Sequence, residues 1–370
     1  MTTALFPIAV LVVAFALSAA LVPVSGWIAR RNGVMDDPGP RKIHDRPMPR
    51  IGGLAVFAAF MVVVLAGYLG VPVLTQLDWV RTQFAAPVAM LHEAYRVQAK
   101  LSALLAGATI VFLVGLLDDV LGSRFHVGLK LAGQVVAALV LITGGVRTDF
   151  LYYPSLNVAF TLVWVVGITN AFNLLDNMDG LCAGVAFVAS SVLLLNAWHL
   201  GEFFISLIFV AFMGSVLGFL LHNWHPARIF LGDCGSLFIG FVLASVTLLE
   251  RYVSHASSTY FPILMPVLVL ALPIVDTGTV TFIRLREGRP IYVGDSRHLS
   301  HRLVSLGMTP PLAVLTIYVI TLALGLGAVT LPHASLVQSL LILLQALAVV
   351  AVVLILLFFE RREQPRRPAP

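Results

Sequence analysis

Five clusters of polar side chains interrupt an otherwise apolar sequence, and their residue types are those of metal and phosphate chemistry. The clusters are Asp36–Gly53, Asp118-Asp119, Asn170–Asp179, Asn223–Ser236 and Asp276–Arg302. A carboxylate at the end of a membrane helix is costly unless it is solvated, paired or bound to a metal. A solvated helix end explains any one cluster by itself, but it does not explain why there are five.

Asp233 has the surroundings expected of a metal ligand. It lies between glycines in Phe230–Ser236, so the backbone can approach a ligand closely. Gly235 and Ser236 are expected to open a helix, whose first amides favour an anion. Because magnesium bridges carboxylate and phosphate oxygens, the segment predicts a magnesium–phosphate site. The alternative is an aspartate that only caps the helix.

The densest cluster places five polar side chains within ten residues: Asn170, Asn173, Asp176, Asn177 and Asp179. The three asparagines would share one face of a continuous helix, whereas the two aspartates would lie off that face. All five converge only if the helix breaks near Gly180. The alternative is that the asparagines form hydrogen bonds between membrane helices.

Two further clusters lie where apolar runs end or begin. Asp118 and Asp119 close one run, and neighbours on a helix point about 100° apart, so they need not share a ligand. Two anions this close repel each other, and a cation or a basic partner would relieve the repulsion. The first cluster, Asp36–Gly53, carries four prolines and five basic side chains, and its Arg50 leads into the next run.

The last cluster contains histidines beside arginines. Residues 294–303 predict a short helix capped by residue 295 or 296. On this helix His298 and Arg297 would each share a face with His301. Two histidines and an arginine suit a phosphate better than a metal ion. A basic loop on the inner side of a membrane would explain the arginine but not the histidines.

Membrane helices must position these clusters. Of the 370 residues, 59% are hydrophobic and 11% are charged, against about 25% charged residues in a typical soluble protein. This composition excludes a soluble globular domain, a disordered chain and a coiled coil. Long apolar blocks exclude an outer-membrane barrel, whose strands alternate. Two cysteines are too few for a disulfide framework or a cysteine-based zinc site.

The charge-free runs predict an all-α, polytopic membrane bundle of about eleven transmembrane helices, with the N-terminus outside and the C-terminus cytoplasmic. The runs are Met1–Ala29, Ile51–Leu77, Leu101–Leu117, Leu131–Val146, Phe150–Leu175, Gly180–Gly201, Phe203–Ala227, Cys234–Leu249, Tyr252–Val275 and Leu303–Phe359, the last divided by a turn at 331–335. In this orientation 18 of the 23 Lys and Arg residues lie in inner loops, as the positive-inside rule requires. All five clusters then lie on the inner side.

We expect a single membrane domain over residues 1–360, with its active site on the cytoplasmic face. Residues 361–370 are expected to form a disordered basic tail, whose arginines lie near anionic lipid.

In their order, the five clusters resemble those of the polyprenyl-phosphate N-acetylhexosamine-1-phosphate transferases (glycosyltransferase family 4). That family includes undecaprenyl-phosphate GlcNAc-1-phosphate transferases and the phospho-MurNAc-pentapeptide translocase. The resemblance rests on Arg46–Gly53, Leu117–Asp119, Asn170–Gly180, Phe230–Ser236 and His298–Leu303. Asn177 and Ser300 depart from the pattern, because the family often has glycine at the first position and histidine at the second.

The resemblance implies a magnesium enzyme, with Mn²⁺ as an alternative ion, that moves a HexNAc-1-phosphate from a UDP-sugar to undecaprenyl or another polyprenyl phosphate and releases UMP. It implies Asp233 as the main metal ligand, with Asn173 near the same ion. Catalytic roles are expected of Asp118, Asp119 and His301. Substrate-binding roles are expected of Lys42, Arg50, Lys130, Asn170, Asp176, Asp179, Asn223, Arg297 and His298.

The resemblance also implies a setting for the enzyme. It places the protein in the bacterial inner membrane as a multi-pass enzyme of cell-envelope polysaccharide synthesis. The expected partners are the two substrates and the lipid bilayer, with no nucleic acid, and a homodimer is a possible assembly.

The reaction joins two anions, so catalysis must come from positioning and charge neutralisation. A lipid monophosphate attacks the β-phosphorus of the UDP-sugar. Asp118 or Asp119 could remove a proton from the lipid phosphate, or one of them could form a covalent phospho-aspartyl intermediate. The sequence leaves both routes open.

Three other interpretations compete. A transporter or flippase would carry charges near the bilayer midplane, and Asp276 is its best candidate residue. A CDP-alcohol phosphotransferase would follow Asp179-Gly180 with an Ala-Arg pair, which this sequence lacks. Phospho-MurNAc-pentapeptide translocase activity is the alternative within the family. That branch has contiguous histidines and a different first loop, so GlcNAc is the favoured sugar.

Overall fold

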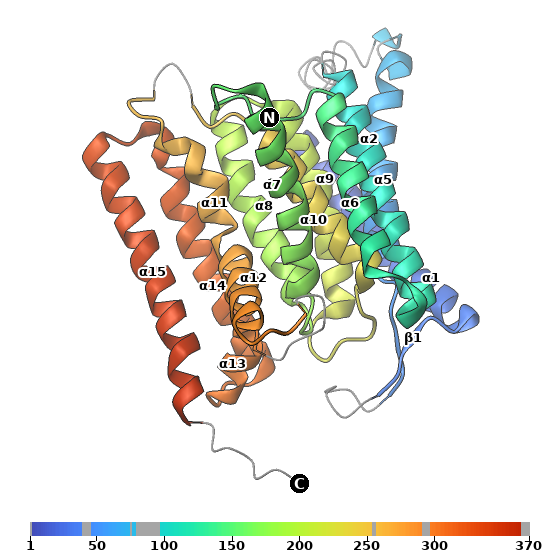
Figure 1. Ribbon diagram of the computed structural model, residues 1–370. Helices are drawn as coiled ribbons and strands as arrows, with labels where there is room; N and C mark the ends of the chain where they lie inside the picture. The colour runs from blue at the N-terminus through green and yellow to red at the C-terminus, as the bar shows by residue number, and fades with distance from the viewer. Residues whose placement is uncertain are drawn as a thin grey trace. The chain divides into compact units, whose positions relative to one another are not determined.

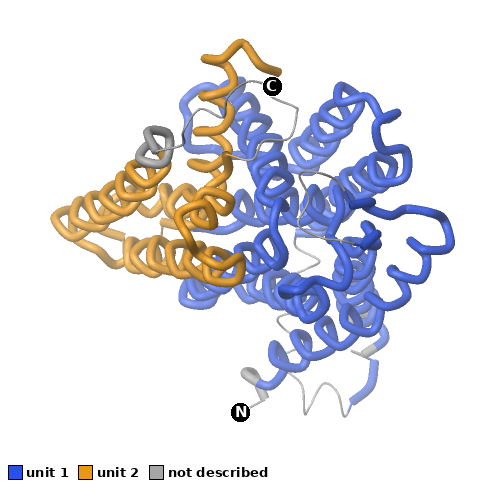
Figure 2. The backbone as a smooth tube through the Cα atoms, turned by 90° about the horizontal axis from the view of Figure 1, so that it is seen from below, with its two compact units in different colours: residues 1–251 blue, residues 252–370 orange. Residues whose placement is uncertain are grey.

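The computed structural model describes residues 2–38, 46–74, 76–78, 97–253, 257–290 and 297–363. Lys42, one of the expected phosphate-binding residues, lies outside these ranges. The chain divides into two compact units, Met1–Arg251 and Tyr252–Pro370, which Figure 2 draws in blue and orange. Each unit is built almost entirely of helices (Figure 1). The all-α class predicted from the sequence is therefore confirmed.

Within its described residues, the first unit contains eight long helices. They are α1 (Thr2–Asn32), α2 (Gly53–Leu74), α5 (Gln98–Leu121), α6 (Val127–Thr143), α7 (Pro154–Leu175), α8 (Leu181–His199), α9 (Phe203–Asn223) and α10 (Gly232–Leu249). A short 3-10 helix, η1 (Gly122–Arg124), joins α5 to α6. Strands β1 (Met35–Asp36) and β2 (Met48–Pro49) pair antiparallel before α2. The apolar runs form helices because a helix satisfies its own backbone hydrogen bonds where no water is present.

Helix α10 forms the centre of this unit. It packs against α2, α5, α7 and α8. Of the residues in its most apolar stretch, 83% are buried, whereas the corresponding share in α1 is 22%. A Cβ atom on Gly115 of α5 would collide with the backbone of Asp233 and Cys234 at the start of α10. Only glycine allows these two backbones to approach so closely. The contact brings the last turn of α5 beside the first turn of α10.

The second unit contains η2 (Phe261–Leu264), α11 (Met265–Val269), α12 (Ala271–Arg286), α13 (Leu299–Ser305), α14 (Pro310–Val329), η3 (Leu331–His333) and α15 (Leu336–Glu363). The turn expected at 331–335 separates α14 from α15. The single helix expected over Tyr252–Val275 is wrong. Instead, residues 261–286 form a helix pair bent by 67°. Pro273 has no amide hydrogen to bond the carbonyl of Val269, so the helix breaks there.

The number of membrane crossings remains a prediction. Among the described residues, nine helices are long and apolar enough to cross a membrane, or ten if the bent pair is one span. Helix α6, with 17 residues, is shorter. Each run expected to span the membrane nevertheless contains a helix, and the protein is a multi-pass membrane protein. The orientation stays a prediction as well.

The C-terminal boundary differs from the expected one. Helix α15 continues to Glu363, so the basic tail does not begin at residue 361, and residues 364–370 lie outside the described ranges. The apolar run simply carries its helix past the first two arginines. Whether residues 1–360 act as one domain stays a prediction, because their contacts group them into two units.

Candidate active site

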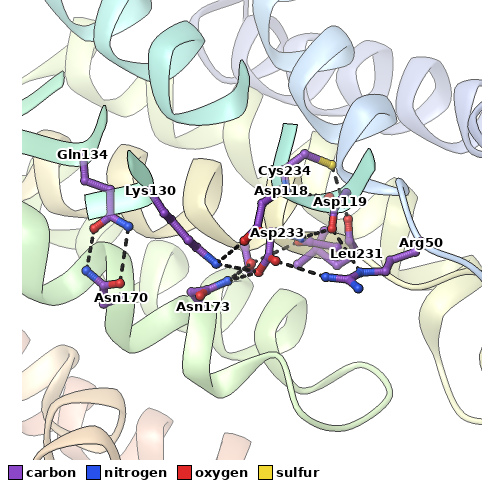
Figure 3. Close-up of polar contacts among 12 residues, drawn as sticks. Arg50, Asp118, Asp119, Lys130, Gln134, Asn170, Asn173, Leu231, Asp233 and Cys234 are labelled. Carbon is purple, nitrogen blue, oxygen red and sulfur yellow. Dashed lines mark hydrogen bonds and ion pairs between the residues drawn. The ribbon is translucent and has the colours of Figure 1, made fainter. Parts of the chain in front are cut away.

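Charged and amide side chains from five segments meet at one end of the first unit (Figure 3). Asp118 and Asp119 lie in the last turn of α5, Lys130 in the first turn of α6, Asn173 in the last turn of α7, Asp233 in the first turn of α10, and Arg50 just before α2. Every member therefore lies at a helix end. This position argues against a transporter site at the bilayer midplane.

Asp233 is the centre of the cluster. Its Oδ1 atom accepts hydrogen bonds from Nδ2 of Asn173 at 2.5 Å and from Nζ of Lys130 at 3.1 Å. Its Oδ2 atom accepts from Nη2 of Arg50 at 3.1 Å. The Asp233 carboxylate thus accepts from two cationic side chains and one amide. This arrangement brings one negative and two positive charges together at the start of α10.

Backbone pairing delivers Arg50 to the cluster. The amide of Phe230 donates to the carbonyl of Pro49 at 2.8 Å, and the amide of Gly52 donates back to Phe230 at 2.9 Å. Burial by itself would lower the pKa of Arg50, but the facing carboxylates of Asp119 and Asp233 raise it above its usual value. Arg50 therefore stays charged at every physiological pH.

Asp119 binds the start of α10. Its Oδ1 accepts from the amide of Asp233 and its Oδ2 from the amide of Cys234, both at 2.9 Å. Nε of Arg50 donates to Oδ1 at 3.1 Å, and the Asp119 side chain is 0% exposed. Helix N-terminal amides favour an anion, and here a carboxylate of the same chain supplies it.

The expected start of this helix was wrong. Helix α10 begins at Gly232, not at Gly235-Ser236. Gly232 has a φ of 76°, which a residue with a side chain rarely adopts. The helix therefore starts three residues earlier, and Asp119 already occupies the amides of Asp233 and Cys234.

Asp118 has a different partner from its neighbour. Its Oδ2 lies 2.9 Å from Nζ of Lys130, and its side chain is 17% exposed. The ammonium group of Lys130 therefore bridges the carboxylates of Asp118 and Asp233. The prediction that the two adjacent aspartates need not share a ligand agrees with this geometry.

The helix break expected near Gly180 is present, because α7 ends at Leu175 and α8 begins at Leu181. Asn177 follows the end of α7, so it does not share a helix face with the other two asparagines. Of the five polar residues in this segment, Asn173 reaches Asp233. Asn170 bonds Gln134 instead.

Two other expected substrate-binding residues join loops to each other. Asp179 accepts from Nδ1 of His225 at 2.9 Å and from the amide of Ala227 at 3.1 Å. Asn223 accepts from the amide of Gly180 and donates to the carbonyl of Ile229. These contacts tie the α7–α8 loop to the α9–α10 loop, and the expected contact of Asp179 and Asn223 with substrate stays a prediction.

Asp176 follows the last residue of α7. Burial, together with the charges of Asp233 and Asp119, raises the pKa of this carboxyl to about 8. A raised carboxyl pKa means that the folded protein binds a proton that the unfolded chain releases near pH 4. The stability from this proton is full below about pH 4 and is lost as the pH rises toward 8.

Replacing Asp176 by Asn should remove this loss. Without divalent cations, the melting temperature of the wild-type protein should fall between pH 5 and pH 8 relative to that of Asp176→Asn. The difference between the two melting temperatures should increase by about 2–4 °C for each kcal/mol of stability that the wild-type protein loses. Fluorescence-detected thermal unfolding at several pH values measures it. Parallel pH profiles for the two proteins would contradict the assignment.

The histidine cluster belongs to the second unit, and its expected helix was partly wrong. Helix α13 begins at Leu299 with His298 as its N-cap, later than expected, and residues 295 and 296 lie outside the described ranges. Arg297 and His298 precede the helix and share no helical face with His301. The cause is Asp276, which accepts from the amide of Leu299 and lies 2.7 Å from Nδ1 of His298. This carboxylate fixes the first residue of the helix.

Each of the three basic residues with an expected role in the reaction here, Arg297, His298 and His301, has surroundings within the second unit that the sequence did not predict. His298 is only 3% exposed, and Arg297 donates to both carboxylate oxygens of Glu287 at 2.9 Å. Burial and the nearby His298 lower the pKa of His301, although Asp276 opposes them. The lowered pKa favours the neutral form of the His301 imidazole. The expected roles of all three in the reaction stay predictions.

Gln134 is not among the functional residues expected from the sequence. This residue is almost completely buried and bonds Asn170 across the α6–α7 interface. Its one signal is a polar residue four positions after Lys130 in an otherwise apolar run. Ser236, whose hydroxyl accepts from Asn173 at 2.8 Å, belonged to a motif but had no expected role.

The chemistry of the cluster fits a hard divalent cation, because Asp118 and Asp233 offer carboxylate oxygens on either side of one positive charge. That charge is the Lys130 ammonium group. In the part of the chain that the structure describes, no group of three or more His, Cys, Asp or Glu side chains is arranged as a metal site. A divalent cation bound between these two carboxylates would share them with Lys130.

The fold and the cluster define a multi-pass membrane protein whose charged site lies at the helix ends. Residues 101–250 match the family model described as glycosyl transferase family 4. A probable undecaprenyl-phosphate N-acetylglucosaminyl 1-phosphate transferase of Bacillus subtilis is 34% identical over 346 residues, which cover 90% of this chain and 88% of the relative. A decaprenyl-phosphate N-acetylglucosaminephosphotransferase of Mycobacterium leprae is 31% identical, covering 82% and 78%.

A phospho-N-acetylmuramoyl-pentapeptide-transferase of Geobacillus thermodenitrificans is 34% identical over 180 residues, or 42% of this chain and 56% of the relative. The chain belongs to glycosyl transferase family 4. It is an enzyme of the polyprenyl-phosphate sugar-phosphate transferase type, and the family expected from the sequence is confirmed.

Proposed function

We propose that this enzyme transfers N-acetylglucosamine-1-phosphate from a UDP-sugar to undecaprenyl or another polyprenyl phosphate and releases UMP. The reaction would take place at the inner face of the bacterial cytoplasmic membrane and supply a lipid-linked sugar for envelope polysaccharide. The carboxylate–cation cluster around Asp233 carries the proposal. The relatives named for N-acetylglucosamine match most of the chain, whereas the pentapeptide transferase matches less than half.

The chain supplies positive charge where two anions must meet. Arg50 and Lys130 lie on opposite oxygens of Asp233, so a phosphate entering the cluster can exchange places with that carboxylate. Fixed cations in a dry site stabilise the charge that develops during phosphoryl transfer. Lys130 and Arg50 would hold the lipid phosphate or the diphosphate, and His301 would donate a hydrogen bond to the diphosphate or the sugar.

The two adjacent aspartates take different roles in this proposal. Asp119 contacts the α10 amides, the Cys234 thiol and Arg50, and its side chain is inaccessible. We assign it the positioning of α10 and Arg50. Asp118 is partly accessible, and it contacts Lys130 and the carboxyl group of Asp233. Asp118 is therefore the one placed to take a proton from the lipid phosphate or to attack phosphorus.

Asp233 and Asp118, with Asn173 beside them, would hold a magnesium ion. A bound Mg²⁺, or Mn²⁺ in its place, would neutralise the diphosphate and the departing UMP. The carboxylates of this chain then have two competing partners, the metal ion and the Lys130 ammonium group. Carboxylate and amide oxygens are the donors that such hard cations prefer.

Replacing Lys130 by Gln should tighten Mn²⁺ binding to the substrate-free protein. A unit charge 4 Å away contributes about 4 kcal/mol at an effective dielectric constant of 20, so removing it should raise the affinity about tenfold or more. Electron paramagnetic resonance of free Mn²⁺ measures the effect, with Asp233→Asn as the variant that should bind weakly. Equal or weaker binding by the Lys130 variant would move the metal site elsewhere.

An assay of UMP release tests the function itself. Purified protein would be mixed with undecaprenyl phosphate, Mg²⁺ and one of several UDP-sugars. UDP-GlcNAc should give UMP and a lipid-diphospho-sugar, and UDP-MurNAc-pentapeptide should give neither. Release from the pentapeptide substrate would favour the translocase alternative, and no release from any sugar would contradict the proposal.

A further inference from the structure

A second polar contact lies one helical turn from the carboxylate cluster (Figure 3). Nδ2 of Asn170 on α7 donates to Oε1 of Gln134 on α6 at 2.5 Å, and Nε2 of Gln134 donates back to Oδ1 of Asn170 at 3.3 Å. Asn170 also donates to the carbonyl of Val166 at 2.8 Å. Gln134 is only 1% exposed. Two amides thus satisfy each other between helices, where an unpaired polar group would be costly.

The spacing of this pair connects it to the cluster. Gln134 follows Lys130 by four residues on α6, and Asn170 precedes Asn173 by three residues on α7. Residues three or four apart lie on the same helix face. Lys130 and Asn173 both donate to Oδ1 of Asp233. The amide pair therefore fixes the register of α6 against α7. It lies one helical turn from the point where both helices donate a hydrogen bond to Oδ1 of Asp233.

We infer that Gln134 and Asn170 form a positioning pair that holds Lys130 against Asp118 and Asp233. The inference rests on the proposed function, in which Lys130 binds phosphate. It gives Asn170 a role different from the substrate contact expected from the sequence. Helix α6 packs against both α5 and α7, and the amide pair is a specific polar contact on the α7 side.

Removing the pair should loosen Lys130 without touching it. In Gln134→Ala the value of kcat should fall about tenfold or more, since a misplacement of about 1 Å can cost up to 10²-fold. In a Lys130→Gln background the same change should cost nothing further, because Gln134 acts through Lys130. An equal loss in both backgrounds would mean a merely structural role and overturn the inference.

A reciprocal exchange keeps the test independent of folding. Gln134→Asn shortens one side and Asn170→Gln lengthens the other, so each single change misplaces the amides. The double variant restores the total length and should recover most of the activity. Failure of the double variant to exceed both single variants would contradict the pairing.

A second readout needs no transferase activity, so it separates this inference from the proposed function. The sequence has three lysines, Lys42, Lys100 and Lys130, whose acetylation can be followed by mass spectrometry. Lys130, with its side chain 15% exposed in two ion pairs, should react faster in Gln134→Ala and return to the slow rate in the double exchange. Lys100 should not change. An unaltered Lys130 rate in Gln134→Ala would overturn the inference even in an active enzyme.

Discussion

Replacing Asp233 by Asn should abolish UMP release while leaving the protein folded. Asparagine has nearly the same shape, so the packing of α10 is kept. However, its NH2 group would face a donor in either orientation: Nη2 of Arg50, which now donates to Oδ2 at 3.1 Å, or Lys130 and Asn173, which now donate to Oδ1. The substitution also removes the charge that Lys130 and Arg50 share. Losing a charge-stabilising group in a preorganised site costs about 10²–10³-fold in turnover, and loss of a metal ligand adds to this.

The matched control is Asp149→Asn. This residue is exposed in the α6–α7 loop, and its substitution makes the same change in net charge. Its turnover should equal that of the wild type. Thermal unfolding of both variants checks that the fold persists. An Asp233→Asn enzyme with near wild-type turnover would place the essential carboxylate elsewhere.

The adjacent aspartates should fail in different ways. Asp119→Ala leaves two α10 amides and Arg50 without their buried partner, and breaking a buried charge pair costs about 3–5 kcal/mol. Asp118→Asn leaves an accessible side chain of the same shape beside Lys130. We therefore expect Asp119→Ala to lose stability and Asp118→Asn to keep it but turn over at least about 10²-fold more slowly.

Fluorescence-detected size-exclusion chromatography after heating separates the two outcomes. Asp119→Ala should lose its monodisperse peak at a temperature several degrees below that of the wild type. Asp118→Asn should lose its peak at the same temperature as the wild type. The turnover of each variant is then compared per folded molecule. If Asp118→Asn unfolds early while Asp119→Ala does not, the two assignments are reversed.

The sequence alone determined the class of the fold and the family. Apolar runs must form helices in lipid, because a helix satisfies its backbone hydrogen bonds within itself. Each expected run accordingly contains a helix, and described members of the first-unit polar clusters meet around Asp233. The end of helix α7 before Gly180 could also be predicted, since Asp176–Gly180 cannot continue the apolar pattern of α7.

The tertiary structure decided what each polar residue does. Adjacent Asp118 and Asp119 look equivalent in sequence, yet one faces Lys130 and the other faces the α10 amides. The early start of α10, the burial of His298 beside Asp276 and the pairing of Gln134 with Asn170 are equally invisible in the sequence. Helix formation depends on local hydrogen bonds, whereas these pairings depend on the register between helices far apart in the chain, which only packing fixes.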